Sequence, residues 1–152
     1  MARRESAPGR VKNTMSGEFI DSNVLVYPHN QTVGINRDIA IELLPRLVQT
    51  RQCRLSVQVL MEFVVVVTRK IPDPLDIDKV MDIVKDMSAW RYFSPRVEDI
   101  LAALQISKKY KIHFWDAMIV RAAVSMEASV IWSEDLNHGK VYEGIPVKNP
   151  FI

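Results

Sequence analysis

The sequence has little of several features that would point to particular classes of protein. Its single cysteine, Cys53, cannot form an internal disulfide, and no cluster of cysteine and histidine is typical of a zinc site. No apolar run approaches the ~20 residues of a membrane-spanning helix, and the charged N-terminus lacks the apolar segment of a secretory signal. We therefore expect a protein of the reducing cytoplasm that has no membrane partner.

A basic surplus is also missing outside the first residues. Lysine and arginine number 20 against 18 aspartates and glutamates, a net charge of +2. Residues 1–14 hold four basic residues and one acid, so they account for +3 and the rest of the chain carries −1. A domain-wide basic surface for nucleic acid is therefore excluded, and any contact with a polyanion must be local.

The remaining composition is that of a globular domain. Hydrophobic residues make up 48% of the chain and charged residues 25%, which excludes the low-apolar, high-charge class of disordered proteins. Residues 1–17 mix arginine, serine, proline and glycine without apolar periodicity. We expect them to form a disordered leader, followed by one domain over 18–152.

Short apolar segments alternate with helical patterns along this domain. We expect strands at 18–27 (ending in a polar loop), 53–57, 89–93, 129–133 and 145–149. We expect helices at 36–50 (kinked or shortened by Pro45), from Asp73-Pro74, from Ser94-Pro95 and at 114–127. The alternation predicts an α/β fold, with a central parallel sheet covered by helices on both faces.

Residues 57–70 fit two structures. Four consecutive valines favour a strand, whereas the length of the segment and a candidate N-cap at Ser56 favour a buried helix. The residues alone leave both open.

Several acids stand where such a sheet binds its ligands, beyond the carboxyl ends of its strands. Asp21 ends the first apolar run, and Asp135 lies two residues past the strand at 129–133. Asp116 lies in the first turn of the helix before that strand, and the intervening 19 residues suit a helix and a returning strand. Asp116 and Asp135 are therefore expected at the same edge of the sheet.

Glu62 joins them if residues 57–70 form a helix, because it would then lie in the second turn after a strand. Four acids from distant positions would converge on one pocket. Clustered carboxylates repel one another unless a cation lies among them, and Mg²⁺ prefers such hard oxygen ligands. A bound metal can activate water and stabilise the leaving oxygen of a phosphodiester.

Each acid also has a plain structural interpretation. Asp21 could form an Asx-type turn, Asp116 could complement a helix dipole, and Asp135 could be an ordinary turn residue. Glu62 is harder to explain in this way, because burying a carboxylate among apolar residues is costly without a partner. Trp115, Trp132 and the methionines Met61, Met81 and Met118 are expected to fill the core.

Four segments resemble the PIN-domain family and, within it, the VapC-type toxins of toxin–antitoxin pairs. The segments are FIDSNVLVY (19–27), LSVQVLMEFVVVVTRK (55–70), IHFWDAMIVRAA (112–123) and VIWSEDLNHGKVYEGIPVKNPF (130–151). The resemblance implies a compact α/β sandwich, a helix at 57–70 and a ribonuclease dependent on Mg²⁺ or Mn²⁺. It also implies a homodimer and a cognate antitoxin as partners.

The resemblance places an acidic catalytic quartet on Asp21, Glu62, Asp116 and Asp135, and supporting hydrogen bonds on Asn23 and Ser133. We expect the first, third and fourth acids to hold the metal ion and Glu62 to complete the cluster. The expected function is that of a metal-dependent endoribonuclease that hydrolyses RNA phosphodiester bonds as the toxin of a type II module.

Two other classes remain open. A non-catalytic PIN-like protein would bind RNA or an antitoxin without cutting, although the intact quartet argues against it. A phosphohydrolase that forms a phospho-aspartate needs a second acid two residues after its nucleophile. Asn23 stands at that place here.

Overall fold

The computed structural model describes residues 16–152. The expected leader lies outside the described residues, apart from Ser16 and Gly17, and Gly17 already begins the first strand. The strands are β1 (Gly17–Ile20), β2 (Cys53–Ser56), β3 (Arg91–Phe93), β4 (Ala128–Trp132), β5 (Val141–Tyr142) and β6 (Ile145–Lys148). The helices are α1 (Ser22–Val26), the 3₁₀ helix η2 (Tyr27–His29), α2 (Ile35–Gln49), α3 (Val57–Arg69), α4 (Ile77–Met87), α5 (Val97–Tyr110) and α6 (Phe114–Ser125).

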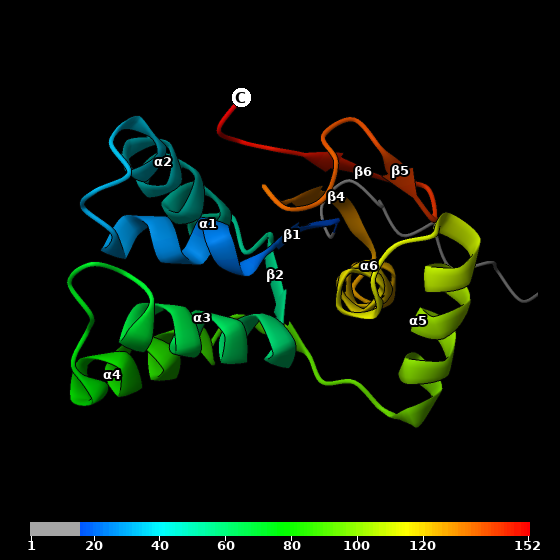
Figure 1. The fold of residues 1–152 in the computed structure, drawn as a ribbon, viewed down its shortest axis with the longest axis horizontal. Helices are drawn as coiled ribbons and strands as arrows, with labels where there is room; N and C mark the ends of the chain where they lie inside the picture. Colours follow the sequence, from blue (N-terminus) through cyan, green and yellow to red (C-terminus); the bar gives the residue numbers. More distant parts are fainter. Residues whose placement is uncertain (1–15) are drawn as a thin grey trace, which may run out of the picture.

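One sheet organises the domain, in the order β3-β2-β1-β4-β6-β5. All neighbours pair in parallel except β5 and β6, which are antiparallel. Helices α1 to α4 lie on one side of the strands and α5 and α6 on the other (Figure 1). The predicted α/β fold with helices on both faces is confirmed.

The expected set of strands omitted β5. This strand has two residues, too few to show a periodicity, and it joins β6 through a tight turn at Glu143 and Gly144. Both turn residues have positive φ, 51° and 80°, as two-residue hairpins require.

The segment 18–27 is not one strand followed by a loop. Strand β1 ends at Ile20 and helix α1 begins at Ser22, because the side chain of Asp21 caps the helix by accepting from the Ser22 N–H. The polar residues therefore turn the chain directly from a buried strand into a buried helix.

Two predicted helix starts are wrong by a few residues. Helix α4 begins after Asp76, whose carboxylate accepts from the Asp78 N–H, rather than at Asp73-Pro74. Helix α5 begins after Arg96, whose N–H is held by the side chain of Asp99 at 2.8 Å, rather than at Ser94-Pro95. In both segments an acid that bonds the first turn determines the start more strongly than the proline does.

Helix α2 continues through Pro45 to Gln49, so the expected shortening does not occur. Proline removes the bond to the carbonyl of Ile41. Ile41 is exposed, so solvent can replace that bond.

Residues 57–70 form a helix, as the resemblance implies. The hydroxyl of Ser56 accepts from the Val59 N–H at 3.2 Å and caps α3. Phe63 and Val67 are fully buried, whereas Val65 is 46% exposed. The four consecutive valines thus divide between the two sides of a helix, and tertiary burial overrides their strand propensity.

The expectation that Trp115, Met61 and Met81 fill the core is wrong. They are 62%, 58% and 52% exposed. Met118 is buried as expected, and Trp132 is half-buried with its indole N–H donating to Glu18 at 3.1 Å. Within residues 16–152, every helix is too short or too polar to span a lipid bilayer.

A pair of truncations on α3 tests its helical structure. Phe63→Ala should lower the free energy of unfolding by about 3–5 kcal/mol, because it leaves a cavity in the core. Val65→Ala should change it by about 0.5 kcal/mol or less, because that side chain faces solvent. Urea denaturation measures both values. A strand would place both residues on the same face, so equal losses would contradict the helix.

Candidate active site

Asp21 stands at the carboxyl end of the central strand β1 and is 4% exposed. One of its carboxylate oxygens accepts from the Ser22 N–H at 2.7 Å and the other from the Ser133 hydroxyl at 2.6 Å. Burial raises its pKa from 3.8 to about 6; the two hydrogen bonds oppose the shift, and the charges of Glu62 and Asp135 add to it. A carboxylate is thus held in place where ionising it is costly.

Ser133 connects this carboxylate to the loop that follows β4. Its hydroxyl, which donates to Asp21, also accepts from the N–H groups of Asp135 and Leu136, each at 3.2 Å. The same oxygen therefore positions both Asp21 and the backbone of Asp135. The resemblance implies a supporting role for this serine by hydrogen bonding; its hydroxyl does form such bonds, and the catalytic role stays a prediction.

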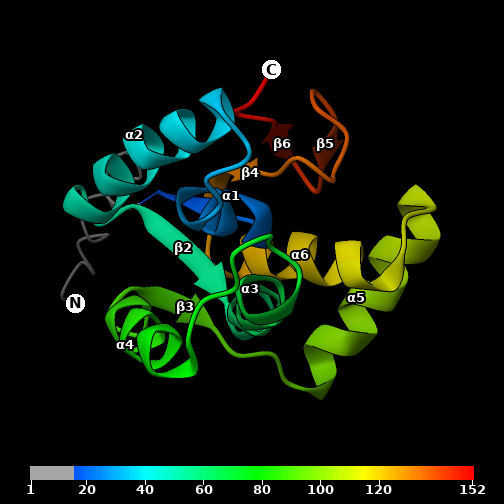
Figure 2. The same cartoon turned by 60° about the vertical axis from the view of Figure 1, so that its left-hand side comes forward.

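Glu62 lies in the second turn of α3 and is joined to two other elements. One carboxylate oxygen accepts from the Ser22 hydroxyl at 3.0 Å and the other from the Gln58 amide at 3.1 Å. The same amide nitrogen donates to the carbonyl of Trp115 at 3.1 Å, in the first turn of α6. These bonds draw together the starts of α1, α3 and α6, which meet near the centre of Figure 2.

Asp116 and Asp135 complete the group from α6 and from the loop after β4. Asp116 is half-buried and Asp135 is exposed. Partial burial raises the pKa of Asp116, and the charges of Asp135 and then Glu62 raise it further against the opposing effect of His113. The charges of Glu62 and Asp135 raise the pKa of Asp21 as well as that of Asp116, so the four carboxylates share one region at the carboxyl edge of the sheet.

The remaining predicted residue, Asn23, does not join this network. Its side-chain nitrogen and oxygen are buried and have no hydrogen-bond partner in the described structure. Ser22 contacts the acids instead, and Gln58 holds Glu62 from one helical turn earlier. The i, i+4 spacing of Gln58 and Glu62 was a signal available in the sequence. No pattern distinguished Ser22 from its neighbour.

The donor set fits a hard divalent cation. Among the described residues, no lysine or arginine forms an ion pair with any of the four acids. Residues 16–152 contain no group of three or more His, Cys, Asp or Glu side chains arranged to hold one ion. Mg²⁺ usually needs only one or two carboxylates, because it keeps several waters. One or two of these carboxylates, completed by water, would therefore be enough to hold such an ion, and the metal-binding set Asp21, Asp116 and Asp135 stays a prediction.

Comparison with known proteins identifies the family. The sequence matches the PIN domain over residues 19–144, which is most of the chain and includes all four acids. This chain belongs to the PIN domain family. No curated protein sequence matches it significantly.

Solved structures share the fold at low sequence identity. The toxin VapC20 of Mycobacterium tuberculosis, described as cleaving the sarcin–ricin loop, superimposes with a TM-score of 0.62 at 13% identity, covering 78% of this chain and 92% of its own. DNA-bound VapBC from Salmonella typhimurium gives 0.60 at 17%, covering 90% and 99%. VapBC2 from Rickettsia felis, bound to a promoter DNA fragment, gives 0.61 at 14%, covering 87% and 97%.

The raised pKa of Asp21 predicts a pH-dependent stability. The folded protein favours the protonated carboxyl, so this contribution is complete below the ordinary pKa of 3.8 and is lost as the pH rises through about 6. In EDTA, the unfolding free energy of the wild type should fall relative to that of Asp21→Asn by up to about 3 kcal/mol between pH 4 and pH 7.

Urea denaturation at several pH values measures this difference. Asp86→Asn, which removes an exposed carboxylate from α4, is the matched control and should follow the wild type. Parallel pH profiles for the wild type and Asp21→Asn would show that Asp21 is not a strained buried acid.

Proposed function

We propose that this PIN domain is a metal-dependent endoribonuclease that acts as the toxin of a toxin–antitoxin pair. The observation that carries the proposal is the convergence of four carboxylates at one sheet edge without an ion pair to lysine or arginine among the described residues. Such an arrangement costs stability, and a divalent cation removes that cost. The likeness of the fold to a toxin that cleaves the sarcin–ricin loop supports RNA as the substrate.

Asp21, Asp116 and Asp135 would hold Mg²⁺ or Mn²⁺. The ion supplies a bound water of lowered pKa and neutralises charge on the scissile phosphate. Ser133 keeps the Asp21 carboxylate oriented toward the edge and fixes the backbone of Asp135. These hydrogen bonds hold the carboxylates in position before any ligand binds, so few side chains would need to reorient during the reaction.

Glu62 has a different part. Ser22 and Gln58 each donate a hydrogen bond to one of its oxygens, and these two bonds fix the orientation of the carboxylate. Each oxygen keeps a lone pair that can accept another hydrogen bond. We assign it the orientation of the attacking water, by accepting a hydrogen bond from it.

Partners of two kinds are proposed. An apolar cavity of about 310 Å³, lined by Met61, Val65 and Trp115, adjoins Glu62, and its exposed side chains suit an antitoxin segment that would cover the acids. The similarity to two VapBC structures supports this partner.

A homodimer is proposed through the exposed apolar side chains of Val97, Leu101 and Leu104 on α5. A light-scattering mass of one chain would contradict it.

Cleavage of a labelled RNA hairpin tests the enzyme activity. The wild type should cut it in Mg²⁺ or Mn²⁺, and EDTA should abolish the cleavage. Asp21→Asn and Asp116→Asn should each lower the rate by about 100-fold or more, because each removes a charged ligand. The control Asp86→Asn should keep the wild-type rate.

Two results would contradict the proposal. Cleavage that persists in EDTA or in Asp21→Asn would exclude the metal mechanism. RNA binding without cleavage in either metal would favour the non-catalytic alternative.

A further inference from the structure

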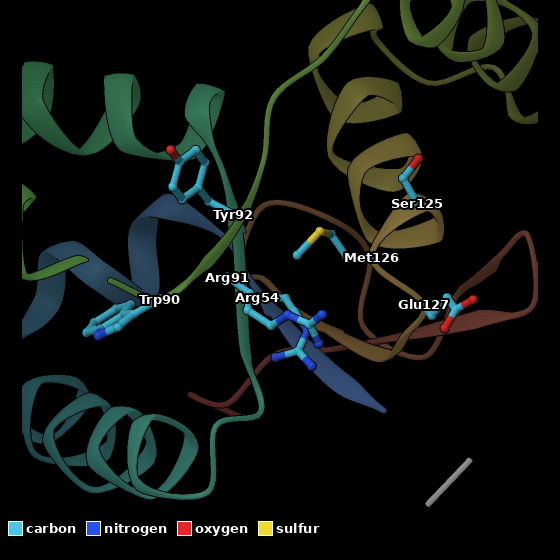
Figure 3. A pocket seen from close by; sticks show the side chains of 7 residues that line it. All are labelled: Arg54, Trp90, Arg91, Tyr92, Ser125, Met126 and Glu127. Atoms are coloured by element: carbon cyan, nitrogen blue, oxygen red, sulfur yellow. The ribbon is translucent and has the colours of Figure 1, made fainter. Parts of the chain in front are cut away.

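A second cavity lies at the edge of the sheet opposite the acids. It has a volume of about 510 Å³ and is shown in Figure 3. One side is lined by Arg54 of β2, by Arg91 and Tyr92 of β3 and by Trp90, which precedes β3; the other side is lined by residues 125–127, at the end of α6 and in the turn before β4. Both strands begin here, whereas Asp21 and Glu62 lie beyond the strand ends. The four-residue strand β2 spans about 13 Å between the two edges.

The guanidinium of Arg54 is built into this cavity. The residue is 3% exposed, and its Nη1 donates to the carbonyls of Arg51 at 2.8 Å and Cys53 at 3.2 Å. The side chain crosses the face of Gly17 on β1. A Cβ at Gly17 would lie 2.3 Å from the Arg54 Cγ, so glycine is needed for this path. Contacts with the backbone of β1, of β2 and of Arg51 thus determine where the Arg54 guanidinium lies.

Arg91 stands beside it on the next strand. The two arginines are register partners in the parallel pairing of β2 and β3, so they project from the same face. Figure 3 shows their guanidinium groups next to each other and the carboxylate of Glu127 directed away from them. Among the described residues, the side chain of Arg91 forms no ion pair and no hydrogen bond. Burial and the charge of Arg91 both lower the pKa of Arg54.

A further cation and an aromatic ring extend the cluster. An adjoining cavity of about 530 Å³ shares Trp90 and Arg91 and is also lined by Arg51. Three arginines therefore lie at the start of β2 and β3, and the half-buried Trp90 lines both cavities, with its indole directed away from the Arg54 and Arg91 guanidinium groups (Figure 3). This grouping is local, because the chain after residue 14 carries a net charge of −1.

We propose that this cavity binds a backbone phosphate of RNA, at the edge of the sheet opposite the carboxylates. Paired guanidinium groups match phosphate oxygens in a bidentate manner, and Trp90, which lines the same cavities, offers an indole on which a neighbouring base can stack. An acidic protein segment would use the cations but not the ring. The inference rests on the proposed function, since it assigns a second contact to the same RNA.

Binding of a fluorescent RNA hairpin, measured by anisotropy in EDTA over a range of salt concentrations, tests this site. Arg91→Gln is the informative variant, because Arg91 is exposed and its removal should leave the fold intact. It should weaken binding several-fold and make the slope of log affinity against log salt shallower by about one. Lys108→Gln, which removes an exposed charge from α5, should match the wild type.

Competitors identify the ligand. Inorganic phosphate at millimolar concentration should displace the RNA only weakly, and polyglutamate should displace it no better than an uncharged peptide. An unchanged affinity and salt slope in Arg91→Gln would overturn the inference. So would strong Arg91-dependent displacement by polyglutamate, which would mean an acidic protein ligand, or by phosphate, which would mean a site for free phosphate.

The two proposals fail separately. Arg91-dependent binding in EDTA, with no cleavage in either metal, would overturn the nuclease and leave the binding site in place. Cleavage with Arg91-independent binding would overturn only the binding site.

Discussion

The burial of one carboxylate at the end of the central strand governs the rest of this domain. Asp21 directly follows β1 and caps the first turn of α1. It also accepts a hydrogen bond from Ser133, the serine that positions the loop after β4. Its ionised form is unfavourable there, since burial and neighbouring acids raise its pKa to about 6. The sequence thus keeps a costly charge at the place where three helices begin. Stability is given up at this point, and the proposed cation would recover it.

Much of the fold could be predicted from the sequence, because buried strands and helices place their apolar residues at regular spacings along the chain. The short apolar runs of β2 and β4 and the spacing in α6 indicate their structures directly. The helix α3 could not be predicted from its residues, because four valines favour a strand and only the packing around Phe63 decides otherwise. The starts of α4 and α5 were missed because a capping acid, and not proline, determines them.

The candidate site could be predicted in outline for a topological reason. Parallel strands end at one edge, so acids that follow them must come together there. Finer detail depends on side-chain directions that spacing does not determine. Ser22 and Asn23 are neighbours of similar polarity, yet one bonds Glu62 and the other is buried without a partner. Trp115 is exposed rather than buried, since the first turn of α6, where it stands, lies at the rim of the sheet.

The two edges of the sheet carry opposite charges. Carboxylates gather where the strands end, and arginines gather where β2 and β3 begin. Under the two proposals, a nearly neutral domain would offer a polyanion both a metal-dependent contact and a cationic one, without a basic surface throughout.

Calorimetric titration of Mn²⁺ at pH 7.5 tests the central claim most directly, because it measures the cation itself rather than the reaction. The wild type should bind Mn²⁺, and Asp21→Asn should bind it at least about tenfold more weakly, which corresponds to about 1.4 kcal/mol. Equal affinities in the two proteins, or no binding by the wild type, would contradict the account of Asp21 as the buried anchor of a cation site.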